Sequence, residues 1–255
     1  MKRIIIAGGG LAGLSLGIAL RQAGVPVSLH EAGSYPRHRV CGEFINGVSS
    51  ETLARLGIAD VFAEALLHSK TEWFLGPERV FQGDLERPAL GASRYWLDEE
   101  LVGRFKCLGG DLQVRSRQSP QAGEGRVWAA GRRPVRGSKW LGLKVHLRGL
   151  SDCRSLEMHL GRHGYLGLAP VERGRVNACG LFLNRGHRGS GLQLLWDYLG
   201  DNGLDGLRDR LREANPDESS FLGVSAFVFG AQDQSEEVLT LGDAESMIPP
   251  FTGNG

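Results

Sequence analysis

The feature that most constrains the fold stands at the start of the chain, where "IIIAGGGLAG" joins a β-branched run to a glycine cluster. The run before the cluster is typical of a parallel strand that is buried on both faces. Gly8, Gly10 and Gly13 form the pattern GxGxxG, and apolar residues at helical spacing follow it. A second strand-like run, "PVSLHE", ends in Glu31. This order of strand, glycine turn, helix and strand predicts a Rossmann-type unit that binds a dinucleotide.

Each of the three glycines has its own part in such a unit. Gly8 permits the tight turn, Gly10 lets the backbone approach a pyrophosphate, and Gly13 lets the helix pack close to the strand. The first residues of the helix, Leu11 and Ala12, point free N–H groups at the phosphates. We therefore expect this segment to bind the pyrophosphate.

The acidic end of the second strand narrows the choice of nucleotide. A carboxylate at Glu31, followed by Ala32, is placed to hydrogen-bond the ribose hydroxyls, which argues against NADP at this site. FAD and NAD use the same local unit, so spacing alone does not separate them. No second GxGxxG is present in the sequence. NAD(P)H, if it is the electron donor, would therefore dock transiently without a Rossmann unit of its own.

The composition favours a soluble globular protein. The chain has 255 residues, 41% of them hydrophobic, and a net charge of +1, which offers no electrostatic argument for binding nucleic acid. No apolar run approaches the length of about 20 residues that spans a membrane. The four cysteines form no CxxC pair and no metal-ligand spacing, so we expect reduced thiols, no metal site and a cytoplasmic location.

Three further segments carry a resemblance to a known group of flavoproteins. They read "PRHRVCGE", "SRYWLDEEL" and "GDAESMIPPFTGNG". In the same order, they resemble signatures of the superfamily that contains the geranylgeranyl reductases, the aromatic hydroxylases of the p-hydroxybenzoate hydroxylase type and the flavin-dependent halogenases. The resemblance implies FAD as the cofactor. It also implies an α/β fold, with a Rossmann-like FAD-binding domain and an interleaved antiparallel-sheet substrate domain.

The resemblance also implies which residues lie near FAD. In the first segment, the residues that would flank the flavin ring are Arg39, Val40, Cys41 and Gly42. In the second segment, an arginine at a helix start would contact FAD, and this residue is Arg94. In the third segment, an Asp and a Pro-rich loop would hold the flavin half, and the residues are Gly242, Asp243, Pro250, Gly253 and Gly255. At "AAGRR", Ala130 replaces the family's Asp, so only a backbone contact is expected there.

The domains are expected to interleave along the chain. The FAD-binding domain would comprise residues 1–65, 93–138 and 236–255, and the substrate domain residues 66–92 and 139–235. Alternating apolar and polar residues in the second part predict a half-buried antiparallel sheet, and residues 192–215 predict two amphipathic helices. His146, His159 and His163 lie along this sheet and could face a substrate, but no residue is assigned as catalytic.

These features predict an FAD-dependent oxidoreductase that acts on a hydrophobic small molecule, isoprenoid or aromatic. The cysteine-containing loop places the chain nearest the geranylgeranyl reductases, although their Tyr-x-Trp-x-Phe-Pro motif is missing. An NAD(P)H-dependent aromatic hydroxylase is the alternative, and a halogenase is disfavoured because the Trp-x-Trp motif is absent. A lipid-like substrate would make peripheral membrane contact reasonable. Family members continue beyond Gly255, so a truncated, non-catalytic flavin-binding module stays open as another class.

Overall fold

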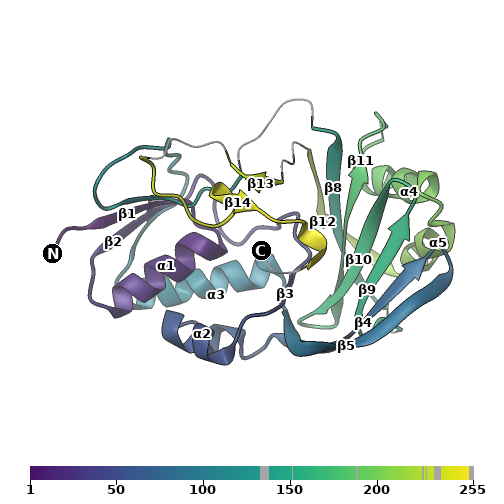
Figure 1. Cartoon of the computed structure of the whole chain (residues 1–255), viewed down its shortest axis with the longest axis horizontal. Coiled ribbons are helices and arrows are strands. Elements are labelled where there is room, and N and C mark those ends of the chain that lie inside the picture. Colours follow the sequence, from purple (N-terminus) through teal and green to yellow (C-terminus); the bar gives the residue numbers. More distant parts are fainter. Residues whose placement is uncertain are drawn as a thin grey trace.

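The protein has two lobes, each built around its own β-sheet (Figure 1). The structure is a computed structural model. It describes residues 1–132, 138–150, 152–187, 189–225, 227, 229–232 and 237–252. A four-stranded parallel sheet with its helices forms one lobe. An eight-stranded sheet forms the other lobe, with α4 (Gly191–Asp201) and α5 (Asp205–Glu213) on its outer face.

The parallel sheet is the predicted Rossmann-like unit. Its strands run in the order β6 (Asp111–Gln113), β2 (Val27–His30), β1 (Ile4–Ala7) and β7 (Arg126–Trp128). The helices α1 (Leu11–Gln22) and α3 (Arg94–Cys107) contact each other beside this sheet. Ile6, Leu29 and Phe105 are fully buried in the core between them. Ile4 and Ile6 pack into this core, whereas Ile5, on the other side of β1, is only partly buried, so the expectation of a strand buried on both faces holds for one face.

Local capping residues explain where the next helices begin and end. The helix α2 spans Ser50–Leu56, and the Ser49 hydroxyl accepts a hydrogen bond from the N–H of Thr52. Gly57 ends this helix in the left-handed conformation, at φ 71°. Ser93 caps α3 in the same way, by accepting from the N–H of Trp96. These caps explain where α2 begins and ends, and the start of α3 at Arg94 confirms the helix start expected there.

The second sheet has eight strands and is not wholly antiparallel. In spatial order they are β12 (Asn215–Ser225), β8 (Trp140–Arg148), β11 (Arg175–Leu183), β10 (Gly164–Val171), β9 (Leu156–Gly161), β4 (Leu66–Leu75), β5 (Glu78–Gly91) and β3 (Phe44–Ile45). The pair β4 and β9 is parallel, which corrects the expectation of a purely antiparallel sheet. Parallel neighbours need a long connection between them. Between β4 and β9 the chain passes through β5, α3, β6, β7 and β8, and this long connection allows the parallel pairing.

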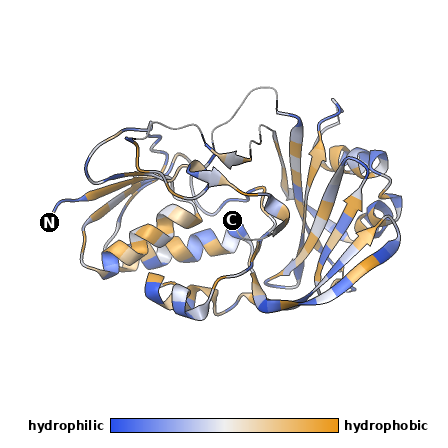
Figure 2. Ribbon diagram, in the orientation of Figure 1, coloured by the Kyte–Doolittle hydropathy of each residue, from blue (hydrophilic) through white to orange (hydrophobic). Residues whose placement is uncertain are grey.

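The eight-stranded sheet is covered differently on its two faces. Leu143, Val145 and Leu147 of β8 pack with α4 and α5 in a continuous apolar core. Figure 2 shows the apolar residues of these strands alternating with polar ones, as the sequence pattern predicted. The opposite face turns toward the first lobe (Figure 1). That face therefore forms one wall of the space between the lobes.

The C-terminal segment returns to the first lobe. The N–H of Trp128 donates to the carbonyl of Leu239 at 2.8 Å, and the N–H of Leu241 donates to the carbonyl of Trp128 at 3.0 Å. The short elements of this segment are β13 (Gly230–Ala231), η2 (Gly242–Ala244), β14 (Ser246–Met247) and η3 (Pro250–Thr252). A further short helix, η1 (Asp60–Phe62), follows α2 and contacts α3. Among the described residues, no helix is both long and apolar enough to cross a membrane.

Candidate functional site

A large cavity of about 1220 Å³ lies between the lobes, and its lining includes residues of both. Fifteen of the predicted cofactor-binding residues line it: Gly8, Gly10, Leu11, Ala12, Glu31, Ala32, Arg39, Val40, Cys41, Gly42, Arg94, Ala130, Gly242, Asp243 and Pro250. Gly13 is not among the lining residues, and Gly253 and Gly255 lie outside the described residues. The structure thus brings together segments that lie far apart in the sequence.

The predicted motifs meet at the first turn of α1. A Cβ on Gly8 would lie 2.2 Å from the carbonyl oxygen of Ala129, and one on Gly242 would lie 2.8 Å from the Cβ of Ala12. Both glycines have positive φ, 112° and 68°. Neither position can therefore hold a side chain without moving its neighbour. The N-terminal glycine motif, the end of β7 and the C-terminal Gly-Asp motif form one continuous surface.

The glycine motif divides into ligand-facing and packing positions. A Cβ on Gly13 would lie 2.0 Å from the carbonyl oxygen of Gly8, so this glycine allows the close packing of α1 on β1. A Cβ on Gly10 would meet only Nη2 of Arg94, at 4.0 Å. The open space at Gly10 and the nearby guanidinium are what a pyrophosphate requires.

The start of α1 has free hydrogen-bond donors. Gly10 is the N-cap and provides no side-chain cap, so the N–H groups of the first turn are available to a ligand. Leu11 and Ala12 in this turn line the cavity. A helix N-terminus with free donors favours a phosphate. These residues therefore fit the phosphate end of a dinucleotide cofactor.

Glu31 is held as an ionised acceptor at the cavity wall. Its carboxylate accepts hydrogen bonds from the N–H groups of Gly9 at 2.9 Å and Gly33 at 2.8 Å, and it pairs with Arg37 at 2.7 Å. Burial alone would raise the pKa of Glu31, but the bond from Gly33 and the charges of Arg37 and Arg39 lower it overall. An ionised carboxylate suits the predicted contact with ribose hydroxyls.

Arg39 and Arg94 are both positioned by one acid that the sequence reasoning missed. Asp98 is fully buried, and its carboxylate pairs with Arg39 at 2.9 Å and with Arg94 at 2.7 Å. The signal was present in "SRYWLD", because Arg94 and Asp98 are four residues apart on one helix. The guanidinium groups are thereby fixed beside the glycine motif.

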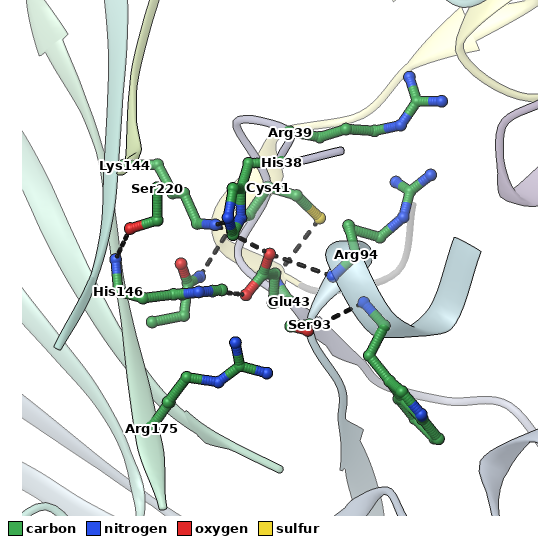
Figure 3. A network of polar contacts seen from close by, with 12 residues as sticks. His38, Arg39, Cys41, Glu43, Ser93, Arg94, Lys144, His146, Arg175 and Ser220 are labelled. Carbon is green, nitrogen blue, oxygen red and sulfur yellow. Dashed lines mark hydrogen bonds and ion pairs between the residues drawn. The ribbon is translucent and has the colours of Figure 1, made fainter. Parts of the chain in front are cut away.

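A second buried acid, Glu43, connects the lobes. Its Oε2 lies 2.5 Å from Nε2 of His146, and its Oε1 lies 3.2 Å from Nζ of Lys144 and accepts from the N–H of Arg94 at 3.1 Å. Lys144 and His146 belong to β8 of the other lobe, while Arg94 begins α3 (Figure 3). Glu43 therefore holds the loop that contains Cys41 and Gly42 against both β8 and the start of α3.

The protonation states in this network follow from its geometry. Burial would raise the pKa of Glu43, but the hydrogen bond from His146 and the charge of Lys144 outweigh it and lower the pKa. Burial and the nearby Lys144 and His146 lower the pKa of His38 to about 4. His38 is thus neutral near pH 7 and can accept from Lys144, whose Nζ lies 3.1 Å from its Nδ1.

None of the three histidines proposed to face a substrate is among the residues lining the cavity. His146 is bound to Glu43, and His159 bonds Glu157 at 2.8 Å and stacks on Phe74. His163 lies in the turn after β9, where its N–H donates to the side chain of Asn202. Successive side chains of a strand point to opposite faces. Met158 lines the cavity, so its neighbour His159 in β9 points to the other face of the sheet.

The eight-stranded sheet gives the cavity an apolar wall. Its lining side chains include Thr71, Trp73, Leu156, Met158, Tyr165, Ala169 and Leu181. The ring of Phe251, from the C-terminal segment, meets the ring of Tyr165 at 6.0 Å between centroids. Burial raises the pKa of Tyr165 and of Cys179, so both stay protonated near neutral pH. This half of the cavity suits an uncharged organic molecule.

Comparison with known proteins supports the prediction that the chain binds FAD. Residues 1–98 match the model of a family described as FAD binding domain. YetM of Bacillus subtilis (strain 168), provisionally named an FAD-dependent monooxygenase, is 39% identical over 109 residues, which are 42% of this chain. The match spans 27% of the length of that curated relative.

Solved structures resemble the whole chain in fold. A tetrameric 2-methyl-3-hydroxypyridine-5-carboxylic acid oxygenase matches with a TM-score of 0.71 and 21% identity, over 100% of this chain and 78% of its own. The myxobacterial FAD-dependent halogenase CndH matches with a TM-score of 0.75 and 17% identity, over 100% of this chain and 71% of its own. At such identities these matches show the fold alone. The chain thus has the predicted α/β flavoprotein fold, residues 1–98 match the model of an FAD binding domain, and FAD is its cofactor.

Proposed function

We propose that this chain is an FAD-dependent monooxygenase that acts on a hydrophobic, aromatic small molecule. The observation that carries the proposal is the division of one cavity into two halves. One half holds the glycine motif, Arg94 and Glu31, and the other is the apolar wall of the eight-stranded sheet. The likeness to YetM supports oxygenation over the geranylgeranyl reductase expected from the cysteine-containing loop, because that relative bears the name of a monooxygenase.

The overall reaction would consume one oxygen molecule and one NAD(P)H. The substrate gains a hydroxyl group, NAD(P)H loses a hydride, and the second oxygen atom leaves as water with the hydride and a proton. FAD, when bound, supplies the redox chemistry of this reaction. The chain's own residues bind the reactants, orient them and exclude bulk water.

Specific side chains would perform these tasks. Arg94, positioned by Asp98, and the first turn of α1 would bind the pyrophosphate. The loop of Cys41 and Gly42, held by Glu43, would lie between the cofactor and the substrate wall. The protonated Tyr165 hydroxyl lines the substrate half, where it can donate to a polar substituent of the ring.

Turnover of a simple aromatic alcohol tests the proposal. The protein is loaded with FAD and supplied with NADH or NADPH, oxygen and 2-naphthol. Nucleotide oxidation that depends on 2-naphthol, with a dihydroxylated product, is the expected result. Reduction of a geranylgeranyl compound without oxygen uptake would instead favour the reductase. FAD binding without turnover of either compound would favour the non-catalytic module.

A further inference from the structure

Gly167 lies near the centre of the eight-stranded sheet, where neither backbone nor packing requires a glycine. It belongs to β10 and is paired on one side with Met158 and on the other with Cys179. Its φ lies outside the left-handed region, so any residue could adopt its backbone conformation. A Cβ would meet nothing closer than 3.6 Å, which is ordinary contact. Because a glycine inside a strand weakens the strand, its presence here needs another explanation.

Other glycines of the same sheet are explained by packing. A Cβ on Gly164 or on Gly180 would lie 2.4 Å from a backbone oxygen of the adjacent strand. Gly167 has no such neighbour, and it lines the cavity. Although β10 is an inner strand, Gly167 is partly exposed, and the space that it faces is the cavity. The missing side chain therefore makes room for something within the cavity.

The strand register describes what surrounds this space. Trp73, Met158, Gly167 and Cys179 form one row across four adjacent strands. Ala169 and Tyr165 lie two residues away on the same strand and so share its face. Two small residues are thus bordered by an indole, a thioether and a phenol. The result is a recess in the apolar wall of the cavity, which we call the Gly167 recess.

No charged side chain from the nearest strand enters the Gly167 recess. Glu157 adjoins Gly167 through its backbone, but its carboxylate pairs with Arg210 of α5 at 2.6 Å. Since α5 covers the opposite face of the sheet, this charge points away from the cavity. The two strands that border Gly167 are about 10 Å apart, a width that admits a ring. Because the Glu157 carboxylate points away and the space is about 10 Å wide, the recess favours an uncharged, flat molecule.

We propose that Gly167 determines substrate specificity, because the Gly167 recess admits a flat, uncharged aromatic ring that any larger residue would exclude. This inference rests on the proposed function and names the substrate class of the same site. Met158 and Trp73 would contact one side of the ring, and the backbone of Gly167 would contact its face.

Binding measurements on three variants test the proposal. Gly167→Ala and Gly167→Leu fill the recess in two steps. Gly103→Leu is the matched control, because Gly103 is exposed on α3 and a Cβ there meets nothing within 4 Å. FAD affinity is measured by quenching of flavin fluorescence, and the melting temperature reports folding. The FAD-loaded proteins are then titrated with 2-naphthol or with its saturated, thicker counterpart 2-decalol, and the flavin absorbance is followed.

We expect every variant to bind FAD within about twofold of the wild type, since the changes avoid the cofactor half. Affinity for 2-naphthol should fall roughly ten- to a hundredfold in Gly167→Leu and a few-fold in Gly167→Ala, because the added atoms overpack the recess. Gly103→Leu should bind as the wild type does. The wild type should bind 2-decalol at least about tenfold more weakly than 2-naphthol.

Several results would overturn the inference. Unchanged 2-naphthol affinity in Gly167→Leu would do so while leaving the proposed function intact, as would equal affinity of the wild type for 2-decalol. Lost FAD binding in a folded Gly167→Leu would assign the space to the cofactor. Failure of the FAD-loaded wild type to bind 2-naphthol would count against the proposed function as well. If Gly167→Leu does not fold, the Gly167→Ala result decides, and an unchanged affinity there overturns the inference.

Discussion

Glu43 is a fully buried carboxylate whose partners, Lys144 and His146, are fully buried as well. Replacing Glu43 with Gln removes the negative charge and leaves the Lys144 ammonium buried without a counter-ion. We expect Glu43→Gln to lower the free energy of unfolding by about 3–5 kcal/mol. Urea denaturation measures this loss. The double variant Glu43→Gln/Lys144→Met should lose less than Glu43→Gln alone, because no buried charge is then unpaired, and a loss equal to or larger than that of the single variant would contradict this account.

Gly242 occupies the point where the C-terminal motif touches α1. Its φ is 68°, and a Cβ would lie 2.8 Å from that of Ala12. Gly76 is the matched control, because its φ is 58° and a Cβ there would meet nothing within 4 Å. Changing either residue to Ala should cost about 1–2 kcal/mol of backbone strain. Only Gly242→Ala should also weaken FAD binding, since it displaces the first turn of α1. Equal FAD affinity in the two variants, measured by fluorescence titration, would contradict this role.

At the scale of elements, the ion pair between Glu157 of β9 and Arg210 of α5 joins a helix to the sheet. Burial opposes ionisation of Glu157, but hydrogen bonds from His159 and Arg210 lower its pKa from 4.5 to about 2. A lowered pKa stabilises the fold above pH 4.5, and the contribution is lost as the pH falls from 4.5 toward 2. It amounts to at most about 3 kcal/mol.

Glu157→Gln should therefore be less stable than the wild type at pH 7, and the gap in unfolding free energy should close as the pH falls to 2. Denaturation at a series of pH values measures this gap. Glu124→Gln serves as the control, because Glu124 forms an exposed pair with Lys2 and should change stability little at any pH. A gap for Glu157→Gln that stays constant down to pH 2 would mean that the charge of Glu157 does not stabilise the contact.

Elements that depend on local signals were predictable from the sequence, and those that depend on distant partners were not. The strand of residues 4–7 and the helix after Gly10 follow from neighbouring residues and are confirmed. The caps of α2 at Ser49 and Gly57 are local signals of the same kind. The parallel pairing of β4 with β9 joins strands about eighty residues apart, and no local pattern encodes it. Glu43 was missed for the same reason, since its partner His146 lies 103 residues away in the sequence and Lys144 is close to His146.

At the scale of the whole molecule, the cavity is a product of both lobes. Residues 1–98 alone match the FAD binding domain, yet the lining also includes Gly142, Cys179 and Phe251, which lie well beyond that segment. Glu43 and the pair of Ser93 with Glu172 cross between the lobes at buried positions. A cofactor in this cavity would therefore contact the second lobe through residues that no local nucleotide motif contains.

This arrangement predicts how FAD stabilises the chain. A ligand that binds only the native state raises its stability by an amount that depends on concentration, about 2.7 kcal/mol at a hundred times the dissociation constant. Because both lobes line the cavity, FAD should slow amide hydrogen exchange in β10 and β11 as well as in the first turn of α1. Exchange measured by mass spectrometry, with and without FAD, tests this. The end of the β4–β5 hairpin, residues 74–81, serves as the internal reference, since none of these residues is among those lining the cavity. Protection confined to the four-stranded parallel sheet and the first turn of α1 would mean that FAD binds the first lobe alone, and that the second lobe contributes only the substrate wall.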